Sequence, residues 1–149
     1  MNHLILTNPS KLLSYTMVYF AVYMLIVYLL RVPYYISNSE SLANEYYVTN
    51  FLTNIPLDYV LVLIYLEIAL FVSRQLGLRQ YFTKTLMVVV LTTALLTGSF
   101  LLYFTQSRQT QSFFSRWFHT VTWRSVVYDM IILGSVYYGY EFMCKATRS

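Results

Sequence analysis

The stretch S125-V-V-Y-D-M-I-I-L-G-S-V-Y-Y-G-Y-E-F142 is long and apolar enough to enter a lipid bilayer, yet it carries one carboxylate, Asp129, in its interior. A charged group at that depth costs several kcal/mol, roughly 2.5–3.5 kcal/mol on insertion scales. Such groups are rare unless they are paired, protonated or in contact with water. Asp129 is therefore either a hydrogen-bonded structural residue or part of a path for protons or cations.

The rest of the chain has the same apolar character. It has 149 residues, of which 58% are hydrophobic and 11% charged, less than half of the roughly 25% charged residues of a soluble domain. Four runs approach the ~20 residues that span a bilayer as a helix: about 12–30, 57–73, 85–104 and 121–143. We predict an all-α integral membrane protein, a four-helix transmembrane bundle that forms one domain over residues 1–149.

Basic residues are distributed unevenly along this expected topology. With four crossings, the segments before the first span, between the second and third, and after the fourth lie on one face of the membrane. These segments contain Lys11, Arg74, Arg79, Lys84, Lys145 and Arg148. The positive-inside rule then predicts that both termini are cytosolic. Elsewhere the basic residues are too scattered for nucleic-acid binding, and one cysteine, Cys144, excludes an internal disulfide.

Two segments outside the spans have recognisable patterns. The outer loop, residues 31–56, is rich in tyrosine and asparagine, and its S37-N-S-E40 has the spacing of a helix capping box. We expect this loop to dock other membrane proteins. Residues 112–120 are predicted to form an amphipathic helix in the headgroup region. Its anchors would be Phe113, Trp117, Phe118 and the nearby Trp123.

The interior polar residues have a structural interpretation. We expect Glu67 and Asp129 to be structural glue, hydrogen-bonded to neighbouring spans, with Tyr15, Tyr19, Tyr23 and Thr97 as candidate donors to Asp129. Asp58 and Arg124 each stand near the start of a span on the same face, so we predict a rim ion pair between them. The alternative function is a small proton or cation channel or transporter that uses Glu67 and Asp129, although no broken helix is indicated.

Small residues indicate where helices approach closely. Ala94 and Gly98 on the third span, and Ser135 and Gly139 on the fourth, have the small-xxx-small spacing that permits tight helix packing. The chain lacks the sequence motifs of metalloproteases and serine hydrolases. We therefore expect a noncatalytic protein without metal, cofactor or small-molecule substrate, whose partners are the lipid bilayer and other proteins.

Between Phe113 and Tyr140, an aromatic and basic segment precedes S125-V-V-Y-D129 and a tyrosine-rich span. This stretch resembles small multi-span virion membrane proteins of nucleocytoplasmic large DNA viruses. The resemblance covers about the last quarter of the chain. It implies a structural protein of the virion inner membrane that anchors minor capsid proteins or shapes the bilayer beneath the capsid. It supplies no catalytic residues.

Overall fold

The first apolar run forms a capped helix in the computed structural model, which describes residues 4–146. The Asn8 side chain accepts a hydrogen bond from the Lys11 backbone N–H at 3.2 Å, and Pro9 takes the first helical position, where its missing N–H is not needed. This helix, α1 (Pro9–Tyr23), continues into the π-helical segment η1 (Met24–Leu29). The chain turns at Arg31, whose φ of 51° is left-handed.

The segment that we expected to be an outer loop is largely helical. It contains α2 (Val32–Ser37), α3 (Glu40–Asn44) and η2 (Glu45–Thr49), and α4 (Phe51–Gln75) begins before the predicted residue 57. The reason is burial, because Leu42, Ala43, Tyr46 and Tyr47 all pack into the protein. We call α2, α3, η2 and the later helix α6 (Phe113–Val121) the cap.

Two further long helices complete the chain, α5 (Phe82–Gln106) and α7 (Trp123–Ala146). Helices account for 84% of the structure, with no strand among residues 4–146, which confirms the all-α prediction. Three helical stretches are long and apolar enough to cross a membrane: Pro9–Leu29, Phe51–Gln75 and Phe82–Gln106. Helix α7 is not among them. Residues 1–3 and the basic Arg148 lie outside the described residues.

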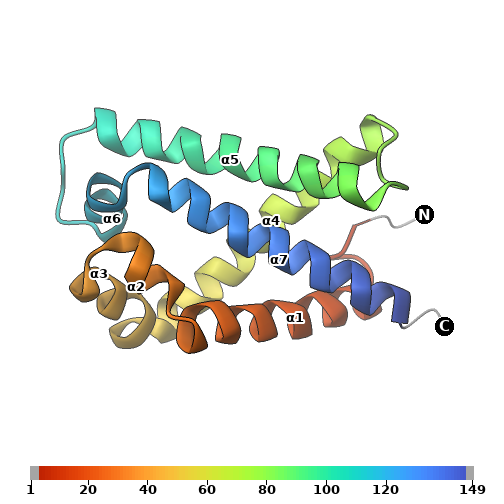
Figure 1. Cartoon of the computed structure of the whole chain (residues 1–149), viewed down its shortest axis with the longest axis horizontal. Helices are drawn as coiled ribbons and strands as arrows, with labels where there is room; N and C mark the ends of the chain where they lie inside the picture. Colours follow the sequence, from red (N-terminus) through yellow and green to blue (C-terminus); the bar gives the residue numbers. More distant parts are fainter. Residues whose placement is uncertain (1–3, 147–149) are drawn as a thin grey trace.

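Helix α7 occupies the centre of the bundle. Figure 1 shows it between α5 and α1, with α4 crossing behind. The start of α1, the turn between α4 and α5, and the end of α7 gather at one end of the bundle, whereas the cap covers the other end (Figure 1). At the first of these ends the Arg79 guanidinium donates to the Glu141 carboxylate and joins the α4–α5 turn to α7.

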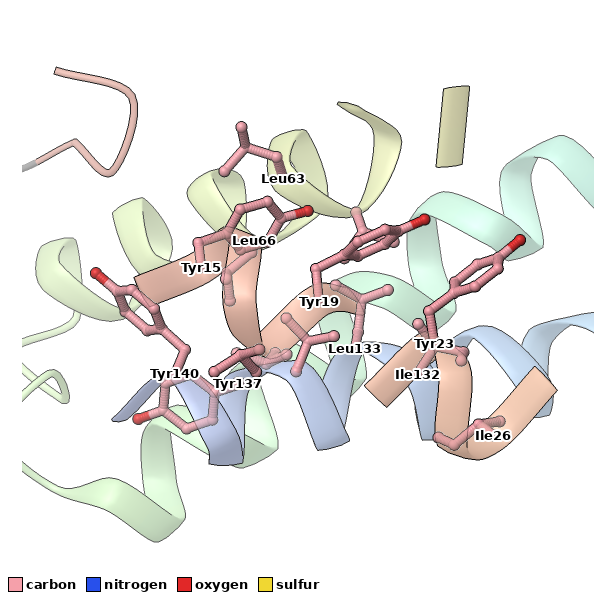
Figure 2. Packing of buried hydrophobic residues seen from close by; sticks show 14 of the residues in the cluster. Tyr15, Tyr19, Tyr23, Ile26, Leu63, Leu66, Ile132, Leu133, Tyr137 and Tyr140 are labelled. Atoms are coloured by element: carbon pink, nitrogen blue, oxygen red, sulfur yellow. The ribbon is translucent and has the colours of Figure 1, made fainter. Parts of the chain in front are cut away.

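A row of tyrosines forms the seam between α1 and its neighbours. Tyr15, Tyr19 and Tyr23 recur every four residues and therefore share one helical face. Figure 2 shows them beside Leu63 and Leu66 of α4 and Ile132, Leu133 and Tyr137 of α7. The Tyr15 hydroxyl donates to the Tyr59 carbonyl at 2.7 Å, and the Tyr19 hydroxyl donates to the Ile55 carbonyl at 3.3 Å. This seam consequently joins apolar burial with hydrogen bonds across the helix interface.

Candidate functional site

A cavity of about 280 Å³ lies where α4, α5 and α7 meet the cap. Aromatic side chains make up most of its wall. They are Tyr23, Tyr46, Tyr47, Tyr65, Phe100, Phe104, Phe113, Phe114, Trp117, Phe118 and Tyr128. Two carboxylates, Asp58 of α4 and Asp129 of α7, line the same cavity. The structure thus brings together two acidic residues that are 71 positions apart in the sequence (129 minus 58).

Asp129 is held by a hydroxyl from a neighbouring helix. Thr97 of α5 donates its hydroxyl to Oδ2 of Asp129 at 2.6 Å. Thr97 was one of the donors expected from the sequence. The three tyrosines expected beside it have other acceptors, since Tyr15 and Tyr19 donate to backbone carbonyls and Tyr23 donates to Asp58. The Asp129 hydrogen bond therefore connects α5 to α7.

Asp58 has partners that the sequence analysis did not assign. Tyr46 of the cap donates to Oδ1 at 2.6 Å, and Tyr23 of α1 donates to Oδ2 at 3.0 Å. The predicted rim ion pair is wrong: Arg124 is exposed and forms no ion pair with Asp58 within residues 4–146. The physical reason is the folded cap, because η2 returns over the start of α4 and brings a phenol to the carboxylate.

Tyrosine hydroxyls also connect the cap to α7. The Tyr47 hydroxyl donates to the Tyr128 hydroxyl at 3.1 Å, and both residues are buried. Burial, and then the neighbouring Asp58 carboxylate, raise the pKa of Tyr46 above its ordinary value, so this phenol stays protonated and donates. Burial likewise raises the pKa of Tyr47. Tyr46 and Tyr47 are consequently neutral, and the acidic groups of the cavity wall are the two aspartates.

The cap is closed by a bidentate ion pair. Arg116 of α6 donates from Nη1 to Oε2 of Glu45 at 2.8 Å and from Nη2 to Oε1 at 2.5 Å. These hydrogen bonds from Arg116 lower the pKa of Glu45. Two parallel N–H···O contacts fix the relative orientation of both groups, and so they hold α6 against η2.

Helix α6 forms where the sequence predicts a helix, but its apolar face packs inside the protein. Trp117 and Phe118 are each 8% exposed, and both line the cavity. Phe113 stacks on Tyr46 with ring centroids 4.6 Å apart. The predicted interfacial role of these three residues is corrected, because amphipathic spacing cannot distinguish lipid from a protein surface as the partner of an apolar face. Trp123, by contrast, is 63% exposed.

Glu67 lies outside the cavity. Its Oε1 atom accepts hydrogen bonds from the backbone N–H groups of Ile5 and Leu6, and it thereby attaches the segment before α1 to α4. The alternative function, a small proton or cation channel or transporter, required Glu67 and Asp129 to act together. The structure does not bring them to one cavity.

The expected packing residues differ in their surroundings. A Cβ atom added at Gly139 would lie 2.7 Å from Cγ1 of Val18, so α1 and α7 approach very closely there. At Gly98 an added Cβ would meet no atom within 4 Å. Ala94 and Ser135 are half-buried. A Cβ added at Gly134, which was not among the expected packing residues, would lie 3.8 Å from Val90 and 3.9 Å from Leu86 of α5, which are ordinary contacts.

The sequence contains a pattern that could have predicted that Asp58 and Asp129 line the same cavity. Asp58 lies seven residues after Phe51, the first residue of α4, and Asp129 lies six residues after Trp123, the first residue of α7. If both helices begin at the same face, a rise of about 1.5 Å per residue places the two carboxylates at comparable depth. The tyrosine donors had no such signal, because nothing in the sequence shows that the segment carrying Tyr46 folds back over the start of α4.

The two carboxylates and the aromatic rings of the cavity wall can accept hydrogen bonds and attract a cation. Among residues 4–146 no three His, Cys, Asp or Glu side chains come together as a possible metal site. Comparison of the chain with known protein families, curated proteins and solved structures finds no match.

Proposed function

We propose that the chain is a noncatalytic structural membrane protein that crosses the bilayer four times and uses its cap to anchor other proteins above the membrane. The observation that carries this proposal is how its interior polar groups are used. Asp58 connects α1 and α4 to the cap, Asp129 connects α5 to α7, and Tyr47 connects the cap to α7. Such an arrangement would hold the cap as a rigid platform.

The central position of α7 supports a fourth crossing. Its 24 residues would extend about 36 Å at 1.5 Å per residue, enough for a ~30 Å hydrocarbon core. Its polar side chains are largely shielded by α1, α4 and α5, and Glu141 is paired with Arg79. The side chains that α7 leaves exposed in its middle are apolar, Val127 and Ile131 among them. A helix surrounded by other helices can cross a membrane with lower hydropathy than its neighbours.

The basic residues support an orientation. Lys11, Arg74, Arg79, Lys84 and Lys145 belong to the end of the bundle opposite the cap. By the positive-inside rule that end would face the cytosol, and the cap would face the other side. If the resemblance of residues 113–140 to virion membrane proteins reflects a shared role, the cap would face a capsid shell from the virion inner membrane.

The outer surface of the cap has the chemistry of a protein contact. Tyr35 is 78% exposed, and beside it the side chains of Arg31 and Glu40 are 54% and 76% exposed and form an ion pair at 3.8 Å. Tyrosine and arginine are enriched at protein interfaces. Residues 31–40 are thus the part of the cap that we expect to touch a partner protein.

A crosslinking experiment in the native membrane tests this function. A photoreactive amino acid at Tyr35 should crosslink to one partner protein in stoichiometric amount, and Tyr35→Asp should remove that protein from the purified complex. The control position is Leu95, which is 73% exposed on α5 and should crosslink to lipid. Lipid adducts alone at both positions would contradict the proposal. Proton or cation flux through liposomes that contain the purified protein would favour the channel instead.

A further inference from the structure

In the part of the chain that the structure describes, the cavity between the helices and the cap is lined by acidic residues without basic ones, and its structural role does not require this. Its charged lining residues are Asp58 and Asp129, and no lysine, arginine or histidine belongs to its wall in the described chain. Each oxygen of Asp58 accepts one tyrosine hydrogen bond. Asp129 accepts from Thr97 at Oδ2, and its Oδ1 atom has no hydrogen-bond donor within residues 4–146. An acceptor is therefore available beside an apolar volume.

We propose that this cavity binds one ammonium group carried on an apolar body, that is, a hydrophobic amine. The ammonium group would lie between the Asp58 and Asp129 carboxylates, where it would donate to the available Oδ1 atom of Asp129. The apolar body would contact the aromatic wall. This goes beyond the anchoring function, which makes no use of the cavity.

The aromatic wall suits such a ligand. Eleven of the twenty lining residues are Phe, Tyr or Trp. The faces of aromatic rings attract cations within about 6 Å, and this attraction is stronger where water is excluded. The same rings bury the apolar part of the ligand. Carboxylates and aromatic faces together favour a cation with an apolar body over either a neutral apolar molecule or a small hydrated ion.

The volume of the cavity accommodates an organic group, and its lining does not suit a metal ion. A volume of about 280 Å³ is nearly twice the ~150 Å³ of an apolar cavity that accepts benzene. A hard divalent cation needs six or more oxygen ligands at roughly 2.0–2.6 Å. Most of this wall is hydrocarbon, so a metal ion would keep its water shell in an apolar environment.

The cavity reaches the outer surface of the bundle between α4 and α5. Leu57 of α4 and Phe100 of α5 both line it, and they are 39% and 45% exposed. In a membrane this surface meets lipid, so an alkyl chain attached to the ammonium group has an exit toward the bilayer. A phospholipid headgroup is a poor fit, because its phosphate would face two carboxylates without a basic residue.

Tryptophan fluorescence in nanodiscs tests the proposal. The chain has two tryptophans. Trp117 lines the cavity and Trp123 is 63% exposed, so Trp123→Phe leaves a reporter at the site. The probe is a long-chain amine with a brominated alkyl chain, which quenches tryptophan on contact, in phosphatidylcholine nanodiscs. The Trp117→Phe protein, which retains Trp123, reports quenching by nonspecific partition into the bilayer.

We expect saturable quenching of Trp117 by the amine. The alcohol and the carboxylic acid of the same brominated chain should bind at least tenfold more weakly. Asp58→Asn combined with Asp129→Asn preserves side-chain shape and should reduce amine affinity to that of the alcohol. The matched control is Glu67→Gln, which neutralises a carboxylate outside the cavity and should leave amine binding unchanged. Competition by 2-phenylethylamine would identify a water-soluble amine as a sufficient ligand, whereas competition only by dodecylamine would identify a membrane-resident one.

Two results would overturn the proposal. Equal affinity of the amine and the alcohol for the unaltered site would show that charge has no part in binding. Unchanged amine affinity in a double asparagine protein that still elutes and melts like its parent would show that the aspartates are not the recognition groups. If the double asparagine protein does not fold, the comparison of amine, alcohol and acid on the unaltered site still decides the question.

Discussion

Gly139 lies where α7 packs tightly against α1, and replacement by alanine should drive the two helices apart. The added Cβ would lie 2.7 Å from Cγ1 and 3.5 Å from Cγ2 of Val18. Real Cβ contacts essentially never fall below 3.0 Å. Val18 is β-branched and stiff about χ1 in a helix, so it cannot rotate away at low cost. Relief therefore requires movement of the helices.

The size of the effect follows from two opposing contributions. Overpacking of a tight contact costs about 1–3 kcal/mol. Exchange of glycine for alanine in a helix contributes up to about 1 kcal/mol of stabilisation. Gly139→Ala should accordingly lower the free energy of unfolding by about 1 kcal/mol, within a range of about 0–2 kcal/mol. Gly98→Ala receives the same helical contribution without a clash, because nothing lies within 4 Å of its added Cβ.

The comparison of these two variants isolates the contact. Unfolding in mixed micelles, followed by helical circular dichroism as the denaturing detergent is increased, should separate them by about 1–3 kcal/mol, with Gly98→Ala the more stable. Val18→Ala removes both Cγ methyl groups, including the clashing Cγ1. The added Cβ would then face Cβ of residue 18 at 3.7 Å, an ordinary contact. The double variant Val18→Ala with Gly139→Ala should thus cost less than the sum of the single variants. Equal stability of the two glycine variants, or strict additivity in the cycle, would refute the close approach.

Three further predictions concern the polar contacts and the topology. Asp129→Leu and Thr97→Val should each lower the free energy of unfolding by about 1 kcal/mol, the scale of an interhelical hydrogen bond in lipid. The Asp129→Asn protein should assemble nearly normally. Equal losses of stability for Asp129→Asn and Asp129→Leu in the same unfolding assay would contradict this prediction. Hydrogen bonds from Arg116 lower the pKa of Glu45, so the ion pair stabilises the cap fully at pH values above the ordinary glutamate pKa of about 4.3 and loses this effect as the pH falls through the lower pKa of the folded protein. Hydrogen exchange of residues 113–121 should increase in that acidic range. Glu45→Gln should abolish this pH dependence. In a cysteine-free background, single cysteines at Ser10 and Asn50, both exposed, should react with an impermeant reagent from opposite sides of the membrane, and labelling from the same side would refute the proposed topology.

The all-α architecture could be predicted from the sequence because it depends on local properties. Long apolar runs without proline in their centres form helices wherever water is excluded, since each backbone N–H must find its acceptor within the segment. The four-residue spacing of Tyr15, Tyr19 and Tyr23 likewise places them on one face of α1 before any partner is known. Helix α6 was predictable in the same way from the helical spacing of its apolar residues.

The partners of these faces could not be predicted, because they depend on where distant segments meet. The sequence shows that Asp58 stands near the start of an apolar run, but only the folded cap brings Tyr46 to it instead of Arg124. Spacing alone makes Gly98 and Gly139 equivalent, yet the helix axes converge at one and not at the other. The apolar face of α6 could serve lipid or protein equally well.

The long helices and α6, with the faces that they must bury, follow from the sequence alone, because both depend on hydropathy and on the 3.6-residue period; the short helices of residues 31–49 do not. The tertiary structure decided which faces meet, and so it alone placed Asp58 and Asp129 in the wall of one aromatic cavity. Whether a segment is helical depends mainly on residues close to it in the sequence. The position of a side chain between helices depends on how all the helices pack together.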